Sequence, residues 1–253
     1  MSTNLFDLSG KTAIITGCNT GLGQGMAVGL AEAGCNIVAV NRSEPSETQR
    51  RVEASGQGFL AVHADLTSTA PIDDILYQTE QRFGGADILI NNAGLIRRAD
   101  ALDFTEQDWD DVINVNLKSL FFLSQAFGRA CVDKQRRGKI INIASLLSFQ
   151  GGIRVPSYTA SKSGVLGLTR LMANEWASLG LNVNAIAPGY MATNNTQALR
   201  DDPQRSREIL GRIPTGRWGT PEDLVGAAVF LASRASDYVN GHTLAVDGGW
   251  LGR

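Results

Sequence analysis

The chain has 253 residues, of which 43% are hydrophobic and 19% charged, and its formal net charge is −2. This balance is ordinary for a globular protein, and no basic run exceeds two residues, which argues against nucleic acid as a partner. No apolar stretch reaches membrane-spanning length, and the N-terminus lacks a basic-then-apolar secretory pattern. We therefore expect a cytoplasmic protein without membrane contact.

Strand-like and helix-like segments alternate along the chain. Short apolar or β-branched runs predict strands at 12–16, 36–41, 58–66, 86–94, 138–145, 181–189 and 242–246. Helical patterns lie between them at 22–34, 46–56, 70–83, 106–132 (one long helix), 158–180 and 221–232. Nearly continuous apolar strands separated by helices indicate an α/β fold, with a doubly wound parallel sheet of about seven strands covered on both faces. We expect one domain over 1–253, with a polar substrate-loop segment at about 190–220.

Cysteine and histidine are sparse. Cys18, Cys35 and Cys131 have wide, irregular spacing, which predicts neither a disulfide framework nor a zinc site. Two histidines, His63 and His242, are too few to complete a metal cluster. We expect no metal.

A glycine-rich turn follows the first predicted strand. Gly17, Gly21 and Gly23 stand between that strand and the next helix, where glycine lets a diphosphate approach free backbone N–H groups. The spacing differs from the usual dinucleotide fingerprint, and no G-K-[ST] follows, which excludes a P-loop. A tight turn without a ligand is the alternative. After the second strand, Asn41 and Arg42 leave the choice between the 2′-hydroxyl of NAD and the 2′-phosphate of NADP open.

A phenol and an ammonium lie four residues apart in "YTASK". On one helix, Tyr158 and Lys162 face the same way. A nearby ammonium favours phenolate, so we expect it to lower the pKa of the tyrosine toward the range useful for proton transfer. The alternative is an ordinary exposed helical pair.

The ordered motifs "TGCNTGLG", "NNAG", "NVNLKS", "INIAS", "YTASK" and "APGYMAT" together resemble the short-chain dehydrogenase/reductase family over nearly the whole chain. The resemblance implies a Rossmann-type domain, a nicotinamide cofactor and a catalytic tetrad of Asn116, Ser145, Tyr158 and Lys162. Ser145 would hold the substrate oxygen, Lys162 would also hold the nicotinamide ribose, and Asn116 would organise a water chain. The family also commonly forms homotetramers, and the apolar excess of helices 106–132 and 158–180 agrees with that expectation.

The same resemblance implies a set of cofactor residues. We expect NAD to be favoured, with NADP possible. Asp65 would bind the adenine side and Thr193 the nicotinamide carboxamide, but a loop-capping aspartate and a helix N-cap are alternatives. Asn92 could equally be a turn residue. The full set is Gly17, Asn19, Gly21, Leu22, Gly23, Asn41, Arg42, Asp65, Leu66, Asn92, Tyr158, Lys162, Pro188, Gly189 and Thr193.

Further stretches, such as "SFQGGIRVPSYTASKSG", resemble family members that act on deoxy keto-sugar acids. Arg154 would grip the substrate carboxylate, with Arg97 or Arg98 as substitutes, although surface ion pairs are the alternative for all three. Ser145, Gln150, Tyr158 and Asn195 complete the expected substrate set. Rival functions are a reductase of another sugar alcohol or of 3-oxoacyl thioesters, and a nicotinamide sensor without catalysis.

Overall fold

A computed structural model describes residues 4–253 of the chain. Within this part, one parallel sheet has the strand order β3-β2-β1-β4-β5-β6-β7. The order runs outward in both directions from the β1–β4 boundary, which is the switch point where ligands bind in such sheets. The seven strands are β1 (Thr12–Thr16), β2 (Asn36–Asn41), β3 (Phe59–His63), β4 (Ile88–Asn91), β5 (Gly138–Ile143), β6 (Leu181–Pro188) and β7 (Thr243–Val246).

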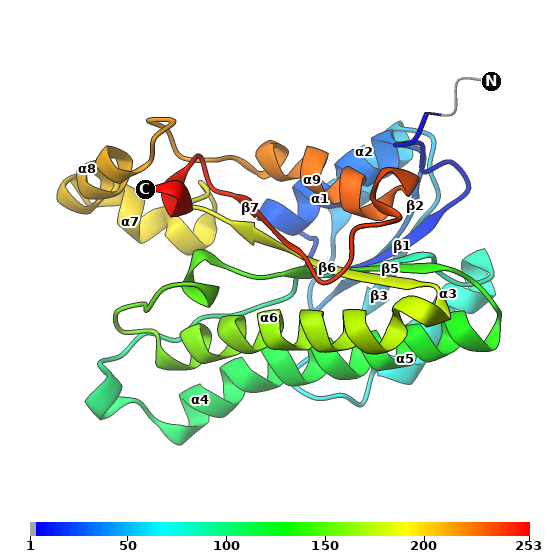
Figure 1. Ribbon diagram of the computed structural model, residues 1–253, viewed down its shortest axis with the longest axis horizontal. Helices are drawn as coiled ribbons and strands as arrows, with labels where there is room; N and C mark the ends of the chain where they lie inside the picture. Colours follow the sequence, from blue (N-terminus) through cyan, green and yellow to red (C-terminus); the bar gives the residue numbers. More distant parts are fainter. Residues whose placement is uncertain (1–3) are drawn as a thin grey trace.

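Helices cover both faces of this sheet (Figure 1). On one face α1 contacts α2 and α9, and on the other α3 and α6 flank α5. Two short helices, α7 and α8, lie at one end of the molecule near the C-terminus. The helices are α1 (Gly21–Glu32), α2 (Ser46–Ala54), α3 (Ile72–Phe83), α4 (Glu106–Ile113), α5 (Leu120–Asp133), α6 (Pro156–Trp176), α7 (Gln197–Asp201), α8 (Pro203–Arg212) and α9 (Val225–Ala232). The predicted doubly wound α/β fold is confirmed.

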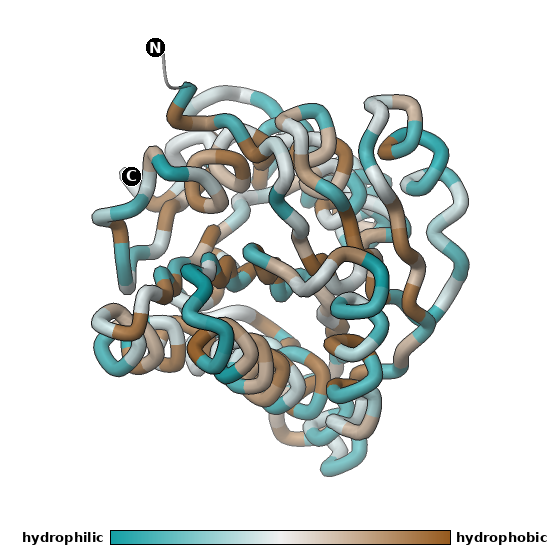
Figure 2. Tube along the Cα trace, turned by 90° about the vertical axis from the view of Figure 1, so that its right-hand side faces the viewer, coloured by the Kyte–Doolittle hydropathy of each residue, from teal (hydrophilic) through white to brown (hydrophobic). Residues whose placement is uncertain are grey.

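The two faces of the sheet bury separate apolar clusters. Neighbouring residues of a strand point to opposite faces, so Ile15 packs in the cluster that contains Met26 of α1, and Ile14 in the one that contains Phe127 of α5. Every residue of β1 is buried for this reason. Figure 2 shows the hydrophobic segments concentrated in the interior and the hydrophilic ones mainly at the periphery.

The expected single helix over 106–132 is interrupted by a π-helical turn. Residues Asn114–Ser119 have π geometry between α4 and α5, although the helix axis continues through them. A π turn inserts an extra residue into the helical repeat, and such turns are common at functional sites. Sequence periodicity did not predict it.

Candidate active site

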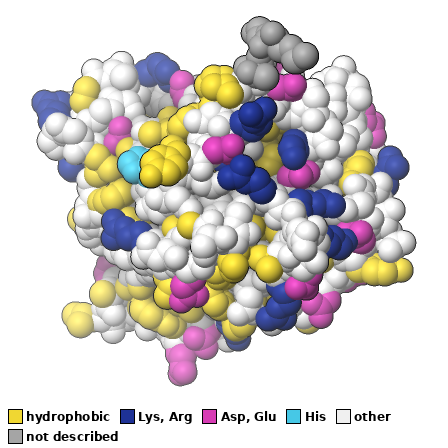
Figure 3. Space-filling view, turned by 45° about the vertical axis from the view of Figure 1, so that its right-hand side comes forward, with side chains coloured by type: hydrophobic (Ala, Val, Ile, Leu, Met, Phe, Trp, Pro, Cys, Tyr) yellow, Lys and Arg dark blue, Asp and Glu magenta, His cyan; other side chains and the backbone are white. Residues whose placement is uncertain are grey.

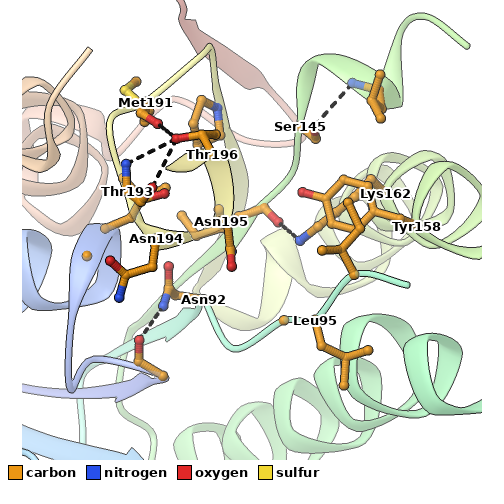
Figure 4. Close-up of a pocket in the computed structure, with 18 of the residues that line it drawn as sticks. Asn92, Leu95, Ser145, Tyr158, Lys162, Met191, Thr193, Asn194, Asn195 and Thr196 are labelled. Carbon is orange, nitrogen blue, oxygen red and sulfur yellow. Dashed lines mark hydrogen bonds between the residues drawn. The ribbon is translucent and has the colours of Figure 1, made fainter. Parts of the chain in front are cut away.

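A cavity of about 1080 Å³ opens along the carboxyl ends of the strands. Loops after β1 to β6 line it, together with parts of α6, α8 and the C-terminal segment. In Figure 4, Tyr158 and Lys162 lie across this space from the segment 193–196, and Asn92 lies at its edge. Every predicted cofactor residue lines the cavity, as do Ser145, Gln150 and Asn195, whereas Asn116 and Arg154 do not. The space is large enough for a dinucleotide with a small substrate.

The glycine loop packs tightly against the loop after β4. Gly17 has a φ of 66°, and a Cβ there would come within 2.9 Å of the Ala93 Cα atom. A Cβ on Gly23 would meet the carbonyl oxygen of Gly17 at 2.3 Å. The Asn92 amide donates to that same oxygen at 2.7 Å, which joins the two loops. These contacts explain why both positions need glycine.

The third glycine opens onto the cavity. Gly21 has a φ of 59°, and a Cβ there would have only Thr193 in its neighbourhood, at 3.7 Å. Thr193 is the N-cap residue of a short turn over Asn194–Thr196, so its N-cap alternative holds, yet it also lines the cavity. The N-terminus of α1 therefore opens onto the cavity at Gly21, with room for a diphosphate to approach the backbone.

The adenosine end of the cavity is polar. Asn41 accepts hydrogen bonds from the backbone N–H groups of Cys18 at 2.7 Å and Asn19 at 3.1 Å, so its side chain supports the glycine loop. The Asn19 amide donates to the Ser43 hydroxyl at 2.8 Å. Arg42 is exposed and lines the same end. No carboxylate stands at the end of β2 to bind a ribose 2′-hydroxyl.

Asp65 and Leu66 close the far side of this end. The Asp65 carboxylate accepts a hydrogen bond from the backbone N–H of Thr67 at 2.9 Å, and this bond lowers its pKa. The loop-capping alternative therefore holds for Asp65, although the residue also lines the cavity.

Ser145, Tyr158 and Lys162 converge at the other end. Lys162 is 4% exposed, and its ammonium donates to the carbonyl oxygen of Ile143 at 2.6 Å. The Ser145 hydroxyl accepts only a long bond from the backbone N–H of Leu147, at 3.2 Å. An ordinary exposed helical pair was the alternative for Tyr158 and Lys162. That alternative is wrong, because Lys162 is buried and Tyr158 is half-buried.

Burial is the largest influence on the pKa values of Tyr158 and Lys162. It raises the pKa of the Tyr158 phenol, while the Ser145 side chain and the charge of Arg98 oppose the rise. This direction is opposite to the lowering expected from Lys162, because removal of the phenol from water outweighs the effects of Ser145 and Arg98. Burial also lowers the pKa of the Lys162 ammonium to about 8.

Asn116 lies in the π-helical turn and acts on the loop after β4. Its carbonyl oxygen accepts from the Leu95 N–H at 2.9 Å, and its amide donates to the Leu95 carbonyl oxygen at 3.0 Å. The amide also contacts the Ser161 hydroxyl at 3.3 Å. With both ends of the side chain bonded and no place in the cavity lining, Asn116 positions the loop in this structure.

The arginine expected to grip the substrate lies elsewhere. Arg154 has a φ of 64°, and its exposed guanidinium pairs with Asp100 at 3.0 Å outside the cavity lining. The structure thus shows no contact of Arg154 with the cavity, and its expected role toward the substrate carboxylate stays a prediction. Arg97 also lies outside and pairs with Asp108 and Asp111. Arg98 does line the cavity, and it donates to the Asn195 carbonyl oxygen at 3.3 Å.

Sequence reasoning missed several residues that build the site. Ser148 donates to the Lys162 carbonyl oxygen at 2.6 Å and accepts from the Ser145 N–H at 3.2 Å, so it fixes the serine loop relative to α6. Its spacing from Ser145 was the available signal. Arg212 and Trp250 also line the cavity, and no local pattern marked them.

Among residues 4–253, no group of three or more His, Cys, Asp or Glu side chains could hold a metal ion. The three cysteines are free and buried. No described helix is both long and apolar enough to cross a membrane.

A family model described as enoyl-(acyl carrier protein) reductase matches residues 17–251. With this match and the relatives below, the chain belongs to the short-chain dehydrogenase/reductase family, a class of oxidoreductases. The 2-dehydro-3-deoxy-D-gluconate 5-dehydrogenase of Escherichia coli K12 is 66% identical over 253 residues, covering 100% of both chains. The enzyme of that name from Bacillus subtilis is 57% identical and covers 98% of this chain and 97% of its own.

Solved structures agree with this family. A candidate 2-deoxy-D-gluconate 3-dehydrogenase of Agrobacterium tumefaciens with bound NADP is 57% identical, with a TM-score of 0.95 over 99% of this chain and 100% of that one. A gluconate 5-dehydrogenase of Burkholderia cenocepacia, in complex with NADP and tartrate, is 40% identical, with a TM-score of 0.94 over 100% of both chains.

Proposed function

We propose that this chain is a nicotinamide-dependent dehydrogenase that interconverts the 5-hydroxyl and 5-ketone of 2-dehydro-3-deoxy-D-gluconate. One observation carries the proposal: Ser145, Tyr158 and Lys162 meet in a cavity whose opposite end is the glycine loop. The names of relatives up to 66% identical over the full chain supply the substrate. The unit is a single catalytic domain over 1–253, with the segment at about 190–220 as its substrate loop.

The chain's own groups would hold the cofactor along the cavity. The N-terminus of α1 and the loop around Gly21 would hold the diphosphate, Asp65 and Leu66 would border the adenine side, and Thr193 would hold the carboxamide. When bound, a nicotinamide cofactor accepts or supplies the hydride. Lys162 has two ammonium protons left after its bond to Ile143, and these would be available to donate to the nicotinamide ribose.

Tyr158 is the general acid and base in this proposal. For alcohol oxidation its phenolate removes the hydroxyl proton, and for reduction the phenol returns it. Ser145 holds the substrate oxygen, because its hydroxyl has donor capacity free and lies beside Tyr158. Arg98 favours the phenolate, since its positive charge lowers the pKa of the phenol. Asn116 serves the same site indirectly by fixing the loop at Leu95.

The adenosine end is proposed to accept NADP as well as NAD. Arg42, Asn19 and Ser43 offer donors for a 2′-phosphate, and Asn41 in place of an acid removes the repulsion that would exclude it. Two solved relatives also contain NADP. The preference for NAD expected from the sequence stays a prediction.

A homotetramer in the cytoplasm completes the proposal. Trp109, Phe122 and Leu171, on α4, α5 and α6, are each at least 40% exposed although they belong to the helices expected to pair between subunits. Other apolar residues of those helices, such as Val112 and Met172, are buried within the chain. Figure 3 shows that hydrophobic side chains also gather in patches on the face that it displays. Exposed apolar area of this kind favours association.

A substrate panel tests the function directly. The purified protein is incubated with NAD or NADP and with 2-dehydro-3-deoxy-D-gluconate, D-gluconate, a neutral sugar alcohol, a 3-hydroxyacyl thioester or an enoyl thioester with reduced cofactor. We expect the highest kcat/KM for the deoxy keto-sugar acid, read from nicotinamide absorbance. A thioester that outperforms every sugar acid would instead support the acyl reductase named by the family model. No turnover with any member would support a nicotinamide sensor.

A further inference from the structure

The arginines that line the cavity differ in whether another group of the chain already binds the guanidinium. Arg205 forms an ion pair with Glu208 of the same helix at 2.7 Å, so it already has a carboxylate partner. Arg98 donates to the Asn195 carbonyl oxygen, and its charge acts on the Tyr158 phenol. Arg212, the last residue of α8, lines the same cavity and has no carboxylate within ion-pair distance among residues 4–253.

An aromatic platform holds Arg212 in place. The central carbon of its guanidinium lies over the Trp250 ring, 4.1 Å from its centre, a cation–π contact that favours this position. Trp250 is 5% exposed, donates its indole N–H to the side-chain Oε1 of Gln150 at 3.3 Å and packs on Tyr190 with ring centres 4.6 Å apart. The edges of the guanidinium, which carry the N–H donors, are left for another partner.

The platform connects Arg212 with the catalytic serine. Gln150 belongs to the loop that follows Ser145, and its backbone N–H donates to the Leu146 carbonyl oxygen at 3.1 Å. Ile209 of α8 is 3% exposed and packs in the apolar cluster of Leu146 and Trp250. The guanidinium is therefore held at a set position relative to the serine loop, by residues far apart in the sequence.

We infer that Arg212 binds the carboxylate of the sugar acid, in two-pronged fashion, from its platform on Trp250. A planar guanidinium with both N–H edges available matches a carboxylate in geometry and charge. This inference rests on the proposed function, and it replaces Arg154 as the carboxylate ligand.

The chemistry of the substrate explains why Arg98 is less suitable. In 2-dehydro-3-deoxy-D-gluconate three carbons separate the carboxylate from the carbon that reacts, so the acid group lies away from Tyr158 when the reacting carbon is beside it. A carboxylate on Arg98 would also cancel the charge that lowers the pKa of the phenol, and would thus oppose oxidation. Arg212 can neutralise the acid without affecting the phenol in this way.

The test compares a charged and a neutral substrate. Wild type, Arg212→Gln, Arg212→Lys and Arg207→Gln are assayed on the sugar acid and on its primary amide, with the cofactor saturating. Loss of a charge-assisted hydrogen bond predicts a roughly ten- to hundredfold lower kcat/KM for Arg212→Gln on the acid, mostly through KM. On the amide the loss should be small. Arg207 is exposed on the same helix and does not line the cavity, so its variant should match wild type on both.

Two outcomes would overturn the inference. Arg212→Gln with equal loss on acid and amide, or with none, would mean that Arg212 supports α8 instead. Wild-type behaviour of Arg212→Lys would mean that any cation at this helix C-terminus suffices, because a lysine serves the helix dipole equally well but cannot make the two-pronged contact. If wild type does not turn over the amide, calorimetric Kd values for acid and amide on the cofactor-loaded protein give the same comparison. Failure of wild type with every sugar acid would refute the proposed function and is distinguishable from both outcomes.

Discussion

The ammonium of Lys162 lies 5.7 Å from the centre of the Tyr158 ring and donates to the Ile143 carbonyl oxygen at the end of β5. The C-terminal residue of β5 thus holds the Lys162 ammonium near the Tyr158 ring. Burial makes the charged ammonium costly, and this cost lowers the pKa of Lys162 to about 8.

Removing the phenol proton donor should slow turnover strongly. Tyr158→Phe keeps the ring and the packing but has no exchangeable proton, so we expect kcat to fall by about 10²–10⁴-fold, the usual contribution of a general acid–base group. Binding of NAD or NADP, measured by calorimetry, should change little. Near-normal kcat in this variant would mean that another group transfers the proton.

Arg98 should set the pH dependence of oxidation. Its charge lowers the pKa of the Tyr158 phenol, so Arg98→Met raises that pKa. Oxidation needs the phenolate, and the rising limb of kcat/KM against pH should therefore move to higher pH in the variant. Arg97→Met is the matched control, since Arg97 pairs with acids outside the cavity lining. Identical limbs in wild type and Arg98→Met would refute this coupling.

Lys162→Met should inactivate the enzyme and stabilise its cofactor-free form. The pKa of Lys162 is lowered from 10.5 to about 8, so the folded state bears the full cost of the buried charge below pH 8, and that cost shrinks steadily as pH rises from about 8 to 10.5. Allowing for the lost hydrogen bond, we expect a gain on the order of 2 kcal/mol in the free energy of unfolding at pH 7. Denaturant titrations at several pH values measure it.

A stabilisation that did not shrink at high pH would have another cause, such as packing of the methionine. A loss of stability at pH 7 would contradict the prediction outright. Lys118→Met serves as the control, because Lys118 lies on the π-helical turn but is exposed.

Arg42 should matter for one cofactor only. If its guanidinium meets the 2′-phosphate, Arg42→Ala should lower kcat/KM with NADP roughly ten- to hundredfold and leave the value with NAD nearly unchanged. Steady-state kinetics with both cofactors provides the comparison. Equal effects on NAD and NADP would place Arg42 outside the phosphate site.

Exposed apolar side chains on α5 and α6 should control assembly. Phe122→Glu combined with Leu171→Glu places charges where subunits would meet, so light scattering should report a smaller species than wild type. Tyr77→Glu, at a 63% exposed position on α3, should leave the mass unchanged. A wild-type monomer at micromolar concentration would exclude the tetramer.

Local sequence patterns were sufficient for much of the fold. The strand at 12–16 and its glycine turn are contiguous in the sequence, and a run of apolar and β-branched residues is enough to predict a buried strand. The Tyr158–Lys162 pair was predictable for the same reason, since one helical turn joins them. The π-helical turn at Asn116 was not, because six residues carry too little periodicity to distinguish it from an α-helix.

Long-range contacts determine the parts of the site that local patterns did not predict. The position of Arg154 depends on a positive φ and on Asp100, and neither is visible in the motif around it. Arg212 acquires its place from Trp250, which in turn is held by Gln150, one hundred residues away in the chain. Such a cluster requires the folded chain before it can be recognised.

Isotope transfer tests the central claim most directly. The sugar acid is labelled with deuterium on the carbon that bears the 5-hydroxyl, and the protein is supplied with oxidised cofactor. We predict that the deuterium appears at the nicotinamide ring of the reduced cofactor, by NMR, and that the Tyr158→Phe variant shows no transfer on the same timescale. Reduced cofactor without deuterium, or transfer at the wild-type rate in Tyr158→Phe, would contradict the account.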